Sequence, residues 1–585
     1  MNLLNKNEKW LFRYVRNHWD VILILLFVAS THLIHLSADP PMYLSSSGGL
    51  FGDESALAHN ARNKVLFGVW KTDGWNPIIY NPILTGLEYV SFSVAGVGLA
   101  QLRVVNVIAT LLGFYLLFFA LKEASGRRVA VFATVLLCWN YTFLMYTRLG
   151  LNDAFLFFPM ALTFYFFVKG LSNPSFFLYA GISSFACYIT KASALYYILA
   201  VLFTLAIGTI RTRITREKPG LPVKSILWYL LGLAASYGAW YGFFFLPNKA
   251  DFGQVGQSWL NLAAPHSLAR YWHNLSSFSF FRYLRGAPVV VIVSWISLPI
   301  LIYSALRDWT KSSSVLMLSL LWLFGGYFSL NGLNYRPLRY FIPLIPAICI
   351  VTSFALDKIW RFSFYKNPVM AKLTPIRWLI PIVVIVLWTG ILLFRVTGFK
   401  NTTRWTGEVV GVWVIAGICL YLYKRFDRRE SQISKKGVIG VVSNALVMTM
   451  LLVSFYHQIP AYFRWVRNPN YSVVDTSREL GKILEKAYIG GLWSPLATIE
   501  NKHRALYVGN HWFNYIDTFK IFHLTHLFLW DGNNREELRF LRHAYPEIMQ
   551  NAHLINTYNI KGKPVRLFKI TYPAENTNDQ TSTKK

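Results

Sequence analysis

Hydrophobic residues in this chain fall into long runs that are separated by short polar loops. Thirteen of these runs are long enough to cross or nearly cross a bilayer. Each is predicted to be helical, because lipid offers the backbone no hydrogen-bond partner outside the segment. The runs cover residues 20–36, 104–121, 129–146, 154–168, 176–190, 193–210, 225–246, 287–306, 314–330, 340–356, 378–394, 408–423 and 438–456. The pattern predicts a mainly α, polytopic membrane protein with about 13 transmembrane helices.

The hydrophobic pattern changes after about residue 470. Amphipathic helical stretches such as Ser477–Ala487 and Arg535–Ala544 alternate there with apolar runs of strand length. Those short runs are Tyr488–Leu492, Arg504–Val508 and Val565–Ile570. This alternation predicts a small soluble α/β domain at the C-terminus.

These patterns divide the chain into three parts. We expect a transmembrane domain over residues 1–460, a soluble domain over 470–572, and a disordered polar tail over 575–585. Two long loops of the first part, 37–103 and 247–285, are expected on the same side of the membrane as the soluble domain. The first of these loops ends in an amphipathic stretch that is predicted to lie in the membrane interface.

Composition supports the membrane assignment and changes how the charge is interpreted. The chain is 54% hydrophobic and 15% charged, with 58 basic and 27 acidic residues and a net charge of +31. Such an excess in a soluble protein would indicate nucleic-acid binding, but here the basic residues cluster in short loops between apolar runs. With a cytoplasmic N-terminus, inner loops hold 26 Lys and Arg residues and outer loops 15. This bias predicts that orientation, with an extracytoplasmic C-terminal domain, membrane-lipid contacts and no nucleic-acid partner.

The first candidate for chemistry is the acidic pair Asp53-Glu54, which follows the first apolar run. A carboxylate at the outer membrane surface can act as a general base, bind a metal, or remain a solvated loop charge. Acidic residues are scarce in this chain, so the pair stands out. We take Asp53 and Glu54 as candidate catalytic residues.

Two further candidates lie in short outer turns between apolar runs. Arg148 and Asp153 bracket one turn, where they either form a local ion pair or contact a ligand. Lys191 lies alone in another turn, where it either extends toward the interface or binds a lipid phosphate. We expect Asp153 to orient Arg148, with Lys191 contacting phosphate.

The last candidates are basic and aromatic residues of later outer loops. Arg336, Arg339 and Tyr340 precede the tenth apolar run, and this combination suits a phosphate ester, although membrane anchoring is the alternative. His266 lies in the second long outer loop among other aromatic and basic residues. All the candidates fall on one face of the predicted topology. Together they describe a base beside a phosphate-binding rim, which suits attack on a lipid-linked phosphosugar.

These motifs resemble those of the GT-C superfamily of polyprenyl-phosphate-sugar glycosyltransferases, which includes protein O-mannosyltransferases and lipid A aminoarabinose transferases. Asp53-Glu54 resembles the family's acidic signature, and Thr147-Arg148-Leu-Gly-Leu-Asn-Asp153 its Arg-to-Asp motif. Thr190-Lys191 and Arg339-Tyr340-Phe-Ile-Pro343-Leu-Ile-Pro346 resemble two later motifs. The resemblance covers roughly residues 45–360. It implies that Asp53 is the catalytic base and that Lys191 contacts the carrier phosphate.

The chain departs from this family at two places. Asn81-Pro82 stands where bacterial members often have Lys-Pro-Pro, and the nearest basic residue after the acidic pair is Arg62. The resemblance favours chemistry without a metal, although Asp53, Glu54, Asp153 and two histidines could supply oxygen and nitrogen ligands. The histidines are His266 and His273. The four cysteines lie inside apolar runs without metal or redox spacing.

We therefore expect an inverting membrane glycosyltransferase that requires no cofactor. Its donor would be a polyprenyl-phosphate-linked sugar, and its acceptor a protein, lipid or glycan outside the cytoplasm. The expected location is the plasma membrane. The alternatives are an oligosaccharide ligase, a membrane transporter, and a non-catalytic scaffold that presents the C-terminal domain. The scarcity of ionisable residues within the apolar runs disfavours a polar transport pathway.

Overall fold

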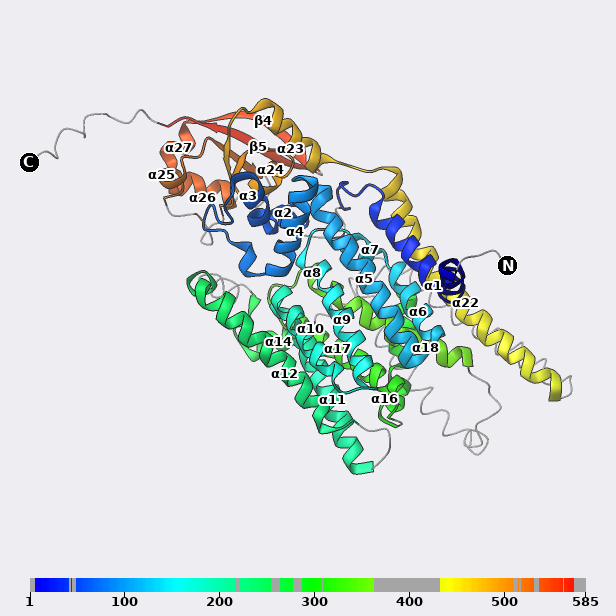
Figure 1. Cartoon of the computed structure of the whole chain (residues 1–585). Helices are drawn as coiled ribbons and strands as arrows, with labels where there is room; N and C mark the ends of the chain where they lie inside the picture. Colours follow the sequence, from blue (N-terminus) through cyan, green and yellow to red (C-terminus); the bar gives the residue numbers. More distant parts are fainter. Residues whose placement is uncertain are drawn as a thin grey trace, which may run out of the picture.

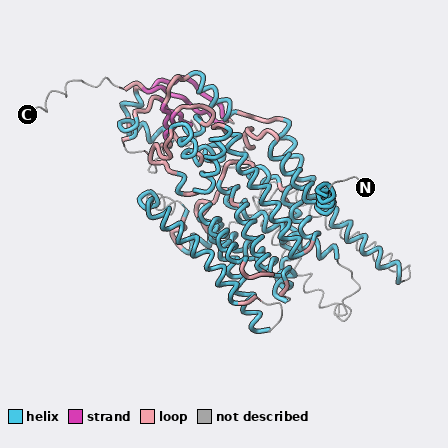
Figure 2. Tube along the Cα trace, in the orientation of Figure 1, coloured by secondary structure: helices cyan, strands magenta, loops and turns pink. Residues whose placement is uncertain are grey.

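The protein consists of a large helical part and a smaller part that contains all the described strands (Figures 1 and 2). The computed structural model describes residues 6–41, 44, 49–215, 221–253, 263–276, 287–307, 309–361, 432–508, 514, 517–530, 536–560 and 562–572. The predicted tail 575–585 lies outside these residues, as do the predicted spans 378–394 and 408–423.

The helical part is a membrane bundle. Eight of its described helical segments are long and apolar enough to cross a membrane, or nine if one bent pair is a single span; two apolar helices are shorter. The mainly α, polytopic fold is confirmed, whereas the number thirteen stays a prediction. The bundle contains α1 (Lys6–Leu33), α5 (Leu99–Ser125), α6 (Arg127–Cys138), α7 (Tyr141–Thr147), α8 (Asn152–Phe155), α9 (Phe157–Gly170), α10 (Phe176–Thr190), α11 (Leu195–Thr215), α12 (Val223–Trp240), α16 (Pro288–Arg307), α17 (Lys311–Asn331), η7 (Leu338–Leu344), α18 (Ile345–Arg361) and α22 (Gln432–Arg467).

The predicted span 129–146 is broken into α6 and α7, which meet at an angle of 73°. Asn140 causes the second helix to start anew, because its side-chain oxygen accepts a hydrogen bond from the N–H of Phe143 at 2.9 Å. The N–H of Tyr141 has no partner within the new helix, and it donates instead to the side chain of Gln458 in α22 at 2.7 Å. The break allows the segment after α7 to carry Asp153 into the bundle.

The first long loop folds into short helices on one end of the bundle. These are α2 (Gly49–Leu57), α3 (His59–Phe67), η2 (Pro77–Ile79) and α4 (Pro82–Ala95). The amphipathic stretch at the end of this loop, residues 84–102, is divided between two helices, because α4 ends at Ala95 and Leu99 begins the next span. Its location in the membrane interface stays a prediction. Gly96 lies between the two helices with φ +82°, a backbone conformation that favours glycine. Asn81 caps α4 by accepting the N–H of Leu84 at 3.2 Å.

The C-terminal part is an α/β unit with a five-stranded sheet in the order β2-β1-β3-β5-β4. Strand β1 pairs in parallel with β2 and β3, while β5 pairs antiparallel with β3 and β4. The three predicted strands correspond to β1 (Tyr488–Gly490), β2 (Arg504–Leu506) and β5 (Lys563–Ile570). The sequence analysis missed β3 (His526–Trp530) and β4 (Ala552–Ile560); six of the nine side chains of β4 are exposed, so it has no clear buried apolar face. The helices are α23 (Ser472–Ile483), α24 (Ser494–Thr498), α25 (Thr518–Phe522), α26 (Glu536–Ala544) and α27 (Pro546–Gln550).

The C-terminal part lies against the helices of the first loop (Figure 1), and buried polar contacts join the two. Arg62 of α3 donates to the carbonyl oxygens of Thr498 at 3.1 Å, Asn501 at 2.9 Å and His503 at 2.7 Å. Glu500 accepts the N–H of Leu99 at the start of α5 at 2.8 Å. Burial lowers the pKa of Arg62 to about 9. Arg62, the first basic residue after the acidic pair in the sequence, therefore joins the two parts of the molecule.

Candidate functional site

An ion pair joins the first loop to η7, the short segment that precedes α18. A carboxylate oxygen of Asp53, in α2, contacts the guanidinium of Arg339, in η7. The Asp53 side chain is 28% exposed and that of Arg339 is 12% exposed. Asp53 is therefore reachable from solvent, while its partner is largely enclosed.

Asp153 and Lys191 extend this ion pair into a network. The Lys191 ammonium contacts one carboxylate oxygen of Asp153, and the other oxygen lies 3.8 Å from Nε of Arg339. We call Asp53, Asp153, Lys191 and Arg339 the charged cluster. Its members come from α2, α8, the end of α10 and η7, and their formal charges sum to zero.

Two tyrosines line the charged cluster. The Nζ of Lys191 lies 3.8 Å from the ring centroid of Tyr340, and the guanidinium carbon of Arg339 lies 5.9 Å from it. Arg339 also donates a hydrogen bond of 3.3 Å to the hydroxyl of Tyr335. These contacts fix the two cations beside one aromatic face.

Local backbone structure explains why these side chains point inward together. Helix α10 ends at Thr190, and Lys191 is extended with φ −159°, so its side chain leaves the helix axis. Asp153 lies in the first turn of α8, where the helix dipole favours a carboxylate. Arg339 lies in a 3₁₀ segment that follows the extended residue Pro337. Each charge therefore lies at a helix end or in a short helical segment.

Burial and neighbouring charges shift the pKa of two cluster members. Removal from water raises the pKa of Asp53 above its ordinary value, and the charge of Asp153 adds to the rise, while Arg339 and Lys191 oppose it. Burial lowers the pKa of Lys191 to about 8, with a further contribution from Arg339, against the opposing charges of Asp153 and Asp53. Asp53 is therefore a stronger base than an ordinary aspartate, and Lys191 can lose its proton near pH 8.

Glu54 lies outside the charged cluster, although the sequence analysis placed it with the catalytic residues. Its two oxygens accept hydrogen bonds from Arg103 at 2.9 and 2.6 Å, and one accepts the N–H of Gly150 at 2.6 Å. Arg103 also donates to the carbonyl oxygens of Leu36 and Ala38 at 2.8 and 2.6 Å. Glu54 thus supports the loop that carries Asp53.

Glu54→Gln is expected to destabilise the protein by about 3 kcal/mol, because it leaves the charge of Arg103 buried without its counter-charge. The Glu54 side chain is 2% exposed, so water cannot replace the lost partner. Thermal unfolding in detergent measures the effect. Glu123→Gln is the control, because Glu123 forms a half-exposed pair with Lys169. Equal unfolding temperatures for the two variants would contradict the structural role of Glu54.

Three other predicted residues also lie outside the charged cluster. Arg148 does not pair with Asp153; it donates to the carbonyl oxygens of Ile34 and His35 at 2.8 and 2.5 Å, and its guanidinium carbon lies 4.2 Å from the Trp465 ring centroid. Arg336 donates to the carbonyl oxygen of Asn274 at 2.5 Å. His266 is exposed just before α14 (Leu268–Ser276). Both arginines donate to backbone carbonyl oxygens, and Arg148 also lies over the Trp465 ring, which indicates that they support the fold.

The sequence analysis considered a metal site formed by Asp53, Glu54, Asp153, His266 and His273. Within the part of the chain that the structure describes, no group of three or more His, Cys, Asp or Glu side chains is arranged to hold a metal ion. The carboxylates of the cluster face Arg339 and Lys191 instead.

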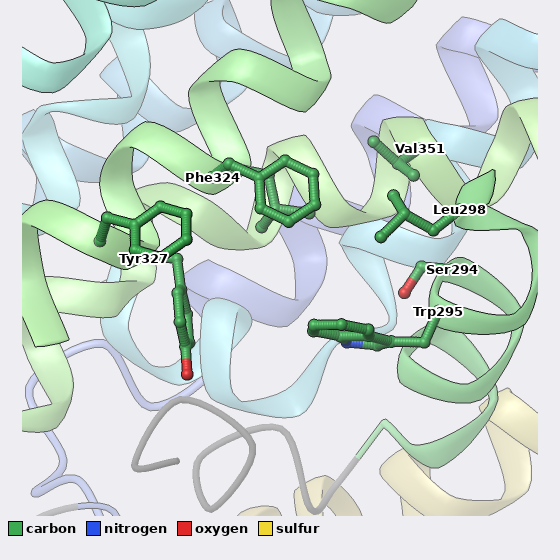
Figure 3. A pocket seen from close by; sticks show the side chains of 8 residues that line it. Ser294, Trp295, Leu298, Phe324, Tyr327 and Val351 are labelled. Atoms are coloured by element: carbon green, nitrogen blue, oxygen red, sulfur yellow. The ribbon is translucent and has the colours of Figure 1, made fainter. Parts of the chain in front are cut away.

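An apolar groove opens elsewhere on the bundle, between α16, α17 and α18 (Figure 3). Its volume is about 80 Å³. It is lined by Ser294, Trp295, Leu298, Leu323, Phe324, Tyr327, Phe328 and Val351. None of these residues belongs to the charged cluster, so the groove suits an apolar group rather than the reacting atoms.

Comparison with known proteins identifies the fold. The family model for dolichyl-phosphate-mannose-protein mannosyltransferase matches residues 83–236, a segment that includes Asp153 and Lys191. The structure is similar to that of ArnT from Cupriavidus metallidurans bound to undecaprenyl phosphate, with 15% identity, a TM-score of 0.51, and 93% of this chain and 97% of ArnT covered. The chain is a membrane protein with the GT-C glycosyltransferase fold.

Two other solved structures are also similar, with TM-scores equal to or lower than that of the first. ArnT from the same organism in the apo state also gives 15% identity and a TM-score of 0.51, with 94% of this chain and 98% of ArnT covered. The oligosaccharyltransferase AglB from Archaeoglobus fulgidus, in complex with an inhibitory peptide and a dolichol-phosphate, gives 11% identity and a TM-score of 0.47, with 97% and 76% covered. No curated protein matches the sequence. The fold expected from the resemblance is confirmed by the likeness to ArnT.

Proposed function

We propose that this GT-C protein transfers a sugar from a polyprenyl-phosphate carrier to an acceptor outside the cytoplasm. The observation that carries this proposal is the charged cluster. A partly exposed carboxylate with a raised pKa lies beside two cations, and these are the groups needed to deprotonate an acceptor and to hold a leaving phosphate.

The donor phosphate would bind to Lys191 and Arg339. Arg339 can bind two oxygens through its planar guanidinium, while Lys191 provides a compact charge on the other side. A phosphate at Arg339 competes with Asp53 for the guanidinium, so donor binding releases the Asp53 carboxylate. Asp153, which contacts both cations, keeps them in position during this exchange.

Asp53 would then accept the proton of an acceptor hydroxyl or amine. The acceptor oxygen or nitrogen forms a bond to the anomeric carbon as the bond from that carbon to the phosphate oxygen breaks. The polyprenyl phosphate leaves with one more negative charge than it had in the donor, and Lys191 and Arg339 stabilise that charge. Attack opposite to the leaving group inverts the anomeric centre.

Two further observations support a lipid-linked donor. The ArnT structure with the same fold contains undecaprenyl phosphate. The apolar groove between α16, α17 and α18 offers a surface for part of a polyprenyl chain. We place the reaction at the outer face of the plasma membrane, with the N-terminus in the cytoplasm, and the acceptor is a protein, lipid or glycan.

The test is transfer by the purified protein in liposomes. With a labelled polyprenyl-phosphate hexose or pentose and a panel of acceptors, we expect release of polyprenyl phosphate together with labelled product. Water-soluble nucleotide sugars should give no product, because they lack the lipid carrier. Uptake of labelled solutes without any transfer would favour a transporter, and the absence of both activities across the donor panel would favour a scaffold.

The rate of transfer is expected to depend on pH in a bell shape. Asp53 must be ionised to accept a proton, so kcat/KM falls as pH drops through its pKa, which lies above the ordinary aspartate value. Lys191 must be protonated to bind phosphate, so kcat/KM falls again as pH rises through about 8. Lys191→Arg should remove this basic limb, because arginine stays charged. An unchanged basic limb in Lys191→Arg would assign it to another group.

A further inference from the structure

The C-terminal sheet presents one edge to the helix that carries Asp53. Because β1, β2 and β3 are parallel, their carboxyl ends lie at the same edge of the sheet. Tyr507 directly follows β2, so it lies at this carboxyl-end edge. Strand β2 is also the last strand at one side of the sheet. The neighbouring helix α24 packs against α2, so this edge of the domain adjoins the site.

At this edge Tyr507 stacks with aromatic residues of the first loop. Its ring centroid lies 4.9 Å from that of Trp75, with the ring planes tilted by 35°. Trp75 in turn lies 5.7 Å from Tyr80. These three residues, with Ala56 of α2, form one apolar cluster. The C-terminal domain therefore reaches the first loop through a side-chain stack as well as through Arg62.

The stack is tied to the backbone of α2. The indole N–H of Trp75 donates to the carbonyl oxygen of Ala56 at 2.6 Å, and Ala56 lies three residues after Asp53. Trp75 is itself held by Asp73, which accepts its backbone N–H at 2.7 Å and pairs with buried His59 at 3.1 Å. Movement of the Trp75 ring would thus change the position of α2.

The pKa of Tyr507 is influenced by members of the charged cluster. Burial raises the pKa of Tyr507, and the next contribution comes from the charge of Asp53, followed by Glu537; Arg339 opposes them. Tyr80 also contributes. Asp53 itself faces Arg339, Asp153 and Lys191. The charge of Asp53 thus acts on a residue of the C-terminal domain as well as on the bundle.

We propose that Tyr507 is a positioning residue of the C-terminal domain: through its stack with Trp75, which is bonded to the backbone of α2, it holds α2 so that Asp53 faces Arg339. This inference rests on the proposed role of Asp53 as the base. It makes the C-terminal domain a part of the reacting site, although Tyr507 itself touches neither donor nor acceptor.

The experiment compares Tyr507→Ala with Tyr507→Phe in the full-length protein. Tyr507→Ala is expected to lower kcat about tenfold, because the base is less well held, with little change in donor KM. Asp53 then faces Arg339 less closely, so the pKa of Asp53 rises and the acid limb of the pH profile moves to higher pH. Tyr507→Phe keeps the ring and should restore both values.

Tyr572→Ala is the matched control. Tyr572 lies in the same domain and donates to the carbonyl oxygen of Leu524 at 2.9 Å, but it has no contact with the first loop among the described residues. If Tyr507→Ala fails to fold, Trp75→Phe provides a second variant, because it keeps a ring and loses only the bond to Ala56. Trp75→Phe should also lower kcat and shift the acid limb.

The result that overturns the inference is a Tyr507→Ala variant with the kcat and pH profile of Tyr572→Ala. A loss of stability and kcat with an unmoved acid limb also overturns it, because that pattern indicates packing alone. Asp53→Asn is assayed in parallel. Absence of transfer by the wild type means that the proposed function fails, and wild-type activity of Asp53→Asn means that the assignment of Asp53 as the base fails. If Asp53→Asn is inactive while Tyr507→Ala behaves as the control, only the inference about Tyr507 fails.

Discussion

Asp53→Asn is expected to lower kcat for sugar transfer about 1000-fold, which is within the range that a general base contributes. Asparagine has nearly the shape of aspartate and can still accept a hydrogen bond from Arg339, but it cannot take a proton. The raised pKa of Asp53 makes this loss larger than for a weakly basic carboxylate. The rate of polyprenyl phosphate release in liposomes measures the effect.

Two variants calibrate this result. Asp53→Glu keeps a carboxylate at a shifted position and should retain more activity than Asp53→Asn. Asp475→Asn alters an exposed aspartate in the first turn of α23 and should behave as the wild type. Activity of Asp53→Asn that equals that of Asp475→Asn would show that another group serves as the base.

Arg339→Ala is expected to lower kcat about 100-fold, as does the removal of one donor from an anion-stabilising site. Arg339 would bind the phosphate of the donor and the greater charge of the departing carrier, so the donor KM should also rise. Arg339 lowers the pKa of Asp53, so its loss should also move the acid limb of the pH profile to higher pH. Steady-state kinetics over a range of pH measure all three quantities.

The control for this variant is Arg478→Ala, which removes an exposed arginine that pairs with Glu500 at 3.0 Å. It should leave kcat and the donor KM near their wild-type values. An Arg339→Ala variant that is folded and binds the donor as tightly as Arg478→Ala would contradict a phosphate-binding role. If the acid limb of Arg339→Ala stays at its wild-type position, Arg339 does not influence the pKa of Asp53, which would contradict the ion pair between them.

The membrane helices were predictable where the requirement is local. Lipid forces each long apolar run to be helical, and the run 176–190 has the bounds of α10. The sequence analysis failed where a polar or glycine residue interrupts an apolar run. Asn140 starts a new helix inside one predicted span, and Gly96 ends α4 inside a predicted interfacial stretch. Both breaks depend on hydrogen bonds and backbone angles that hydropathy does not report.

The charged cluster was predictable only in part. Asp53, Asp153, Lys191 and Arg339 were each recognised as charges beside apolar runs, where an unpaired charge is costly. Their pairing was not predictable, since Asp153 meets Lys191 rather than nearby Arg148.

Residues that support the cluster gave weaker signals in the sequence. The partner of Glu54 is Arg103, which lies 49 residues away. Tyr335 had no usable signal, because extended Pro337 separates it from the 3₁₀ segment that holds Arg339. Tyr507 had none, because it comes from another domain and reaches the site only through the tertiary fold.

The most direct test of Asp53 as a base is the affinity of the Asp53→Asn protein for polyprenyl phosphate, measured by calorimetry in nanodiscs. Asp53 competes with phosphate for Arg339, so the variant is predicted to bind the lipid phosphate at least as tightly as the wild type while its turnover is lost. A loss of affinity that parallels the loss of turnover would contradict the account, because Asp53 would then serve binding or folding rather than proton transfer.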